Sequence, residues 1–114
     1  MADYVELTSA DGQPVCRCRV ARSFASRFRG LMGAARLPSG SGLLLPRTSS
    51  VHTHFMRFPI DVVFLDAEWR IVSVVERLRP WRFAAAKEAS SVLELQAGEC
   101  GRLGLAEGDV LSVS

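Results

Sequence analysis

The sequence lacks any apolar segment long enough to cross a membrane. No stretch of its 114 residues approaches the ~18 consecutive apolar residues that a membrane-spanning helix needs. The N-terminal segment MADYVELTSADG also lacks the basic start and apolar run that are typical of an export signal. We therefore predict a soluble, cytoplasmic protein with no membrane span.

Cysteine is scarce, and its odd count excludes a complete set of disulfides. Cys16 and Cys18 share one face of a predicted strand, whose extended geometry opposes a bond between their sulfur atoms. We expect both, together with Cys100, to be reduced thiols that pack in the core. The sequence has no phosphate-binding loop, dinucleotide fingerprint, calcium loop or nucleophile elbow, so we expect no cofactor and find no complete catalytic motif.

Acidic residues are missing between Asp11 and Asp61, a stretch that contains eight arginines, although the net charge of the whole chain is only +2. Such a basic block can attract phosphate, nucleic acid or an acidic partner. Alternatively, the acidic second half folds back and neutralises it. We favour neutralisation, because arginine outnumbers lysine thirteen to one and this is typical of a compositional bias. Nucleic-acid binding through the block from Arg17 to Arg57 is kept as an alternative.

The length favours one domain, residues 1–114, that can bury a core without disulfides or a structural metal. Period-two patterns predict strands at 4–7, 15–20, 43–45, 50–55, 60–65, 70–78, 91–95 and 110–113, with a helical turn at 98–105. A capping serine and apolar residues at helical spacing predict an amphipathic helix over residues 23–36. We expect residues 79–89 to be an irregular excursion that Trp81 and Phe83 hold in place. We predict an α+β domain: a small, mostly antiparallel barrel or rolled sheet with one principal helix.

The chemically interesting residues lie between His52 and Asp61. His52 and His54 are two apart, which on a strand places both imidazoles on one face, as zinc enzymes place two ligands. The site is incomplete, because a third ligand would have to come from Asp61, a cysteine or elsewhere. Asp61 interrupts an apolar strand, so its carboxylate needs a partner, for which Arg57, His54 and backbone amides are the candidates. Arg57 lies between Met56 and Phe58 and can act as an anion-binding fork.

Six motifs follow one another along the chain: FRGLMG (28–33), GLLLP (42–46), FMR (55–57), PIDVVFLD (59–66), LELQAG (93–98) and GD (108–109). Together they resemble the family called domain of unknown function 192 (DUF192), from about Val5 to Val113. The resemblance implies a small, largely β single domain whose FMR and PID motifs mark its most characteristic surface. Many members have tryptophan at Phe55, lysine at Arg57 and then asparagine, where this chain has Phe58. Many members are also exported.

These observations favour a non-enzymatic binding or accessory module. We expect its cleft to hold a small polar or anionic ligand, or a peptide of a protein partner, and to be lined by His52, His54, Phe55, Met56, Arg57 and Asp61. The alternatives are a metal-dependent hydrolase that uses His52 and His54, and the nucleic-acid binding mentioned above. We expect no metal otherwise, and a monomer or weak dimer.

Overall fold

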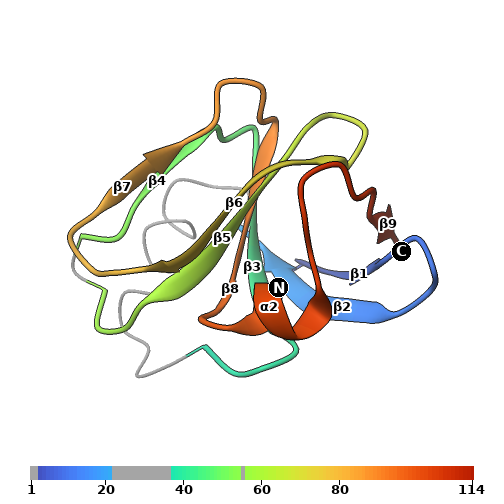
Figure 1. Cartoon of the computed structure of the whole chain (residues 1–114), viewed down its shortest axis with the longest axis horizontal. Coiled ribbons are helices and arrows are strands. Elements are labelled where there is room, and N and C mark those ends of the chain that lie inside the picture. Colours follow the sequence, from blue (N-terminus) through green and yellow to red (C-terminus); the bar gives the residue numbers. More distant parts are fainter. Residues whose placement is uncertain (1–2, 22–36, 55) are drawn as a thin grey trace.

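A curled seven-stranded sheet carries most of the computed structural model, which describes residues 3–21, 37–54 and 56–114 (Figure 1). Its strands run in the order β6 (Ile71–Leu78), β5 (Ile60–Leu65), β8 (Ser91–Gln96), β3 (Ser41–Pro46), β2 (Pro14–Val20), β1 (Asp3–Thr8) and β9 (Ser112–Val113). The β2–β3 pair is parallel, and the other neighbouring pairs are antiparallel. The predicted α+β class with a rolled, mostly antiparallel sheet is therefore confirmed.

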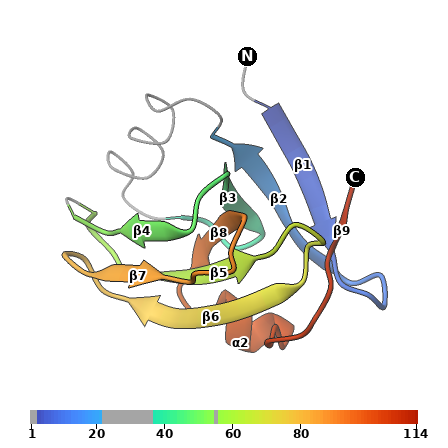
Figure 2. The ribbon, with the colours of Figure 1, turned by 90° about the horizontal axis from the view of Figure 1, so that it is seen from above.

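Two further elements flank the sheet. β4 (Ser50–His52) and β7 (Phe83–Ala85) pair to form a separate antiparallel ribbon. The short helix α2 (Glu99–Leu103) follows β8. Figure 2 shows the ribbon on one side of the sheet and α2 on the other. Within the described residues, no helix is long and apolar enough to span a membrane.

Because side chains alternate along β5 and β8, each of these strands contributes residues to two separate hydrophobic cores. Ile60, Val62 and Phe64 of β5 belong to the core beneath the ribbon, whereas Val63 and Leu65 belong to the core beside α2. Because successive side chains of a strand point to opposite faces, all six residues of β5 are buried. These two clusters are called here the ribbon core and the helix core.

The β5–β6 hairpin forms where the sequence predicts it. Asp66 stabilises the turn, since its Oδ1 accepts hydrogen bonds from the backbone N–H groups of Glu68 and Arg70, both at 2.9 Å. The opening β1–β2 hairpin and the short helix after Gly98 are also confirmed. The predicted helix at 23–36 lies outside the described residues.

Three expectations are wrong in detail. β4 ends at His52 rather than Phe55, and the last strand begins at Ser112, with Val110 forming only an isolated bridge to Arg70. Residues 79–89 are not wholly irregular, because Phe83–Ala85 form β7 and pair with β4. The side chains of Trp81 and Phe83 are 56% and 67% exposed.

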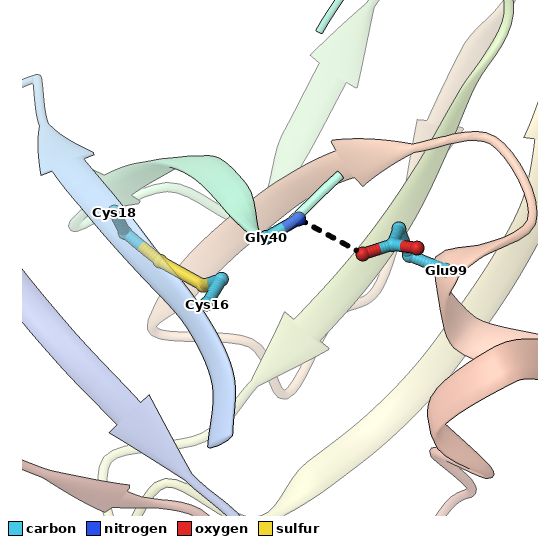
Figure 3. Close-up of a disulfide and its surroundings, with 4 residues drawn as sticks. All are labelled: Cys16, Cys18, Gly40 and Glu99. Atoms are coloured by element: carbon cyan, nitrogen blue, oxygen red, sulfur yellow. Dashed lines mark hydrogen bonds between the residues drawn. A yellow bond between two sulfur atoms is a disulfide. The ribbon is translucent and has the colours of Figure 1, made fainter. Parts of the chain in front are cut away.

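The expectation of reduced thiols also fails for Cys16 and Cys18, which form a disulfide within β2 (Figure 3). Their Cα atoms are 5.8 Å apart, which lies within the range that a disulfide spans. Gly42 of β3 makes room for it: a Cβ there would lie 3.2 Å from each of the two sulfur atoms. Cys100 is a buried free thiol.

Candidate functional site

Thr53 is the buried anchor of the region where the histidines lie. It follows β4 directly, and its backbone carbonyl accepts hydrogen bonds from the N–H groups of Met56 and Trp81, both at 3.1 Å. Its N–H donates to the carbonyl oxygen of Arg82, and its hydroxyl donates to that of Arg79 while accepting from the Arg82 N–H. Thr53 is fully buried, so these bonds join the chain after β4 to the loop before β7 without competition from water.

Four side chains with rings lie next to this anchor and are called here the aromatic row; three of them are in ring contact. The ring centroids of His52 and His54 are 4.9 Å apart, and the His54 ring meets Trp81 edge-on at 5.2 Å. Phe83 faces His52 across the ribbon in the β4–β7 register. Val51 and Ala84 point toward the ribbon core, so the alternation of both strands turns His52 and Phe83 outward. The row is therefore Phe83, His52, His54 and Trp81.

Trp81 adopts a left-handed backbone conformation, with φ of 64°. Bulky residues avoid this region because the Cβ atom crowds the neighbouring carbonyl. The hydrogen bonds to Thr53 hold it there. Strained backbone that is kept in place by its surroundings is common at functional sites, where it aims a side chain.

The two segments that carry the row contain charged side chains of one sign only. Residues 50–60 and 77–87, the two segments that Thr53 joins, contain no aspartate or glutamate. Arg57, Arg79 and Arg82 lie in these segments, and all three are exposed. These two segments therefore contribute only positive charge, which favours anions.

The other predicted site residues lie apart from the row. Met56 is buried in the ribbon core, beneath the surface. Phe55 lies outside the described residues. Asp61 is fully buried and, with Val63 and Leu65, alternates toward the helix core, on the opposite face of the sheet from Met56. The structure therefore brings His52 and His54 together and separates them from Asp61.

Backbone amides satisfy the Asp61 carboxylate, as one of the three sequence candidates proposed. Its Oδ1 accepts from the Arg77 N–H at 2.9 Å, and its Oδ2 accepts from Gly98 at 3.1 Å and Cys100 at 2.9 Å. Charged acceptors make such bonds strong. Asp61 therefore clamps the beginning of α2 to β5 and β6 and has no acceptor capacity directed toward the histidines.

A second carboxylate, that of Glu99 in α2, joins this helix to residues 39 and 40. Glu99 accepts hydrogen bonds from the Gly40 N–H at 3.1 Å (Figure 3) and from the Ser39 hydroxyl, and it pairs with Arg102 through Nε at 2.7 Å. The Arg102 guanidinium and these donors lower the pKa of Glu99 to about 2. Burial, followed by the nearby Asp61 charge, raises the pKa of the Cys100 thiol to about 12, so this thiol is not an activated nucleophile.

Neither α2 nor the row supplies a metal centre. Across residues 3–21, 37–54 and 56–114, no three histidine, cysteine, aspartate or glutamate side chains gather closely enough to hold a metal ion. His52 and His54 therefore provide two imidazoles without a third ligand, which falls short of a catalytic zinc site.

Glu94 of β8 is a buried carboxyl group that the sequence reading did not single out. It alternates with Leu93 and Leu95, which face the helix core, and so points toward the ribbon core between its register partners Leu43 and Val62. Burial raises the pKa of Glu94 from 4.5 to about 7. A glutamate inside an otherwise apolar strand was the signal that could have identified it.

Comparison with known proteins places the chain in a family. The family model described as "Uncharacterized ACR" (DUF192) matches residues 5–113. The chain belongs to the DUF192 family. It is 36% identical over 98 residues to a UPF0127 protein of Thermococcus sibiricus, and 32% identical over 101 residues to one of Thermococcus kodakarensis. The matches cover 82% and 84% of this chain but 63% and 64% of those relatives, so the chain spans slightly less than two thirds of their length.

Two crystal structures share the DUF192 chain's fold. A Sinorhizobium meliloti protein, described as a proposed transcription regulator, superimposes with a TM-score of 0.84 and 25% identity, covering 99% of this chain and 94% of its own. A Novosphingobium aromaticivorans protein of unknown function gives a TM-score of 0.82 at 24% identity, covering 97% and 84%. The family and the fold are thus known, whereas no activity is attached to either relative from Thermococcus or to the Novosphingobium protein.

Proposed function

We propose that this DUF192 chain is a non-enzymatic binding module whose site is the aromatic row together with Arg57. The ligand is a small polar or anionic molecule, or an anionic segment of a partner. The observation that carries the proposal is the contact series His52–His54–Trp81, which a buried threonine holds between two segments, 50–60 and 77–87, that contain no acidic residue. Aromatic walls with a few fixed polar groups are typical of ligand sites.

The imidazoles and guanidinium supply the polar part of this site. The ring N–H groups of the exposed His52 and the half-buried His54 can donate hydrogen bonds to an anion, and the Arg57 guanidinium can hold a carboxylate or phosphate in a bidentate manner. Trp81 supplies an apolar wall that its backbone hydrogen bond to Thr53 orients. In this proposal Met56 supports the site from the ribbon core, and Asp61 stabilises the fold without contacting the ligand.

A metal-dependent hydrolase is a weaker explanation of the same residues. It needs a third metal ligand or a general base beside the histidines, and the described residues bring neither to them. The Asp61 carboxylate, which could have served, is occupied by amides on the other face of the sheet.

Thermal-shift measurements with three probes test the binding role: inorganic tripolyphosphate, an oligoglutamate peptide and neutral maltotriose. We expect at least one anionic probe to raise the Tm of the wild type, and His54→Ala and Arg57→Ala to lose that increase. Tyr4→Ala and Arg17→Ala are matched controls, because Arg17 lies over the exposed Tyr4 ring, 4.7 Å from its centroid, on the distant β1–β2 hairpin. The proposal is wrong if no probe raises the Tm, or if the control variants lose the increase and the row variants keep it.

A further inference from the structure

The aromatic row combines two recognition chemistries on one surface. Its ends, Trp81 and Phe83, expose 56% and 67% of their surface to solvent. Between them, the His54 imidazole contacts both the His52 ring and Trp81. The surface therefore offers several neighbouring π systems rather than one isolated aromatic residue.

The two segments that carry these rings also contain three exposed arginines. Arg79 and Arg82 come from the loop that leads into β7, and Arg57 comes from the segment that follows His54. The carbonyl oxygens of Arg79 and Arg82 bond to Thr53, so their backbones lie next to the histidine-bearing turn. The guanidinium groups are exposed, and no acidic residue of either segment neutralises them.

A ligand that uses both features must present flat rings and repeated negative charge. An acidic peptide supplies the charge but its carboxylate side chains have no π face, and a neutral sugar supplies no charge. A nucleic acid duplex has phosphates, but its bases are already stacked and paired. Single-stranded nucleic acid supplies unpaired bases that stack on aromatic side chains and a phosphate backbone that pairs with arginine.

We propose that this surface takes a short single-stranded nucleic acid, with bases stacked on Trp81 and Phe83 and phosphates paired with Arg57, Arg79 and Arg82. This inference rests on the binding role proposed above and specifies its ligand. It also moves the expected nucleic-acid contact: the relevant cations are those beside the row, two of which lie outside the basic block between Arg17 and Arg57 that the sequence suggested.

Fluorescence anisotropy with a labelled oligothymidylate of about twelve nucleotides, a length within the usual site size, tests the proposal. Because three arginines meet phosphates, the logarithm of the association constant should fall with the logarithm of salt concentration with a slope of about −2, at about 0.7 for each phosphate contact. Trp81→Ala should weaken binding about tenfold, since stacking on one aromatic side chain has about this effect. Trp81→Phe should retain most of the affinity, which separates ring stacking from loss of fold.

Matched variants locate the contact. Arg82→Ala should reduce the magnitude of the salt slope by about 0.7, whereas Arg17→Ala should leave it unchanged. Tyr4→Ala should bind like the wild type. The inference is overturned if Trp81→Ala and Arg82→Ala bind like the wild type, or if the affinity of the oligothymidylate is lost only in the Tyr4 and Arg17 variants.

Competition with oligoglutamate distinguishes this inference from the broader binding role. If the peptide binds with row-dependent affinity and the oligothymidylate does not bind, the ligand is an acidic peptide: the inference fails and the binding module stands. If neither polymer binds at low salt and tripolyphosphate has no effect on Tm, both proposals fail. Displacement of the oligothymidylate only at a large molar excess of oligoglutamate supports the nucleic acid.

Discussion

Replacement of Glu94 by glutamine should stabilise the protein above neutral pH. Glu94 is 6% exposed and points toward the ribbon core, and burial is what raises the pKa of its carboxyl group. A carboxylate in such surroundings loses much of its hydration, whereas the neutral acid loses much less. Glutamine resembles the neutral acid in size and never ionises.

The size of the effect follows from the pKa of Glu94. Raising that pKa from 4.5 to about 7 corresponds to about 3 kcal/mol at about 1.4 kcal/mol per pKa unit. The folded state holds the proton more tightly than the unfolded state does. The free energy of unfolding should therefore be highest near pH 4.5, fall as the pH rises to about 7, and lose nothing more to Glu94 above that pH.

Urea unfolding of the wild type and Glu94→Gln across this pH range measures the effect. The two should be similarly stable near pH 4.5, and the variant should be more stable by up to about 3 kcal/mol at about pH 8. Glu88→Gln is the control, since Glu88 is exposed in the loop between β7 and β8. The reasoning is refuted if Glu94→Gln loses as much stability as the wild type between these pH values.

Substitutions at Thr53, at Asp61 and at two glycines give three further tests of the fold. Thr53→Val leaves buried backbone groups without their hydroxyl partner and should lower the free energy of unfolding by about 1–3 kcal/mol, whereas Thr53→Ser should lose much less; chemical denaturation compares them. Asp61→Ala removes the acceptor of three backbone amides and should lower the free energy of unfolding by about 3 kcal/mol or more. A decrease of less than about 1 kcal/mol would show that the amides find other partners. Gly42→Ala places a Cβ 3.0 Å from Leu95 Cδ2 and should lower the Tm. Gly101→Ala lies in α2, where the nearest atom to the new Cβ is 3.5 Å away, and should raise the Tm. Equal changes of Tm in the two variants would contradict this reasoning.

Local sequence patterns predicted the parts of the fold that form between neighbouring segments. The β5–β6 hairpin follows from two apolar strands joined by Asp66 and its turn, because every determinant lies within about twenty residues. The β4–β7 ribbon was not predicted. Its strands have three residues each and lie about thirty residues apart, so neither shows a clear period-two pattern of its own.

In the candidate site, too, the sequence predicted local features but not the contacts between distant segments. The sequence indicated that His52 and His54 lie together, since their spacing is local, but it could not show that Trp81 joins them through the loop that Thr53 holds. Asp61 was grouped with the histidines because it is close in sequence, yet its amide partners lie 16 to 39 residues away on the other face of the sheet. Burial of Glu94 likewise depends on what covers the sheet, which strand alternation alone does not reveal.

The most direct test of the aromatic row as the binding surface is a set of NMR spectra that follow the two indole N–H signals and the histidine ring signals during addition of oligothymidylate. The chain contains two tryptophans and two histidines, so every signal is informative. Trp69, which packs against the helix core, is an internal control. We predict that the Trp81 signal and both histidine signals shift together while the Trp69 signal stays in place. Shifts at Trp69 alone, or none at Trp81 and the histidines, would contradict this account.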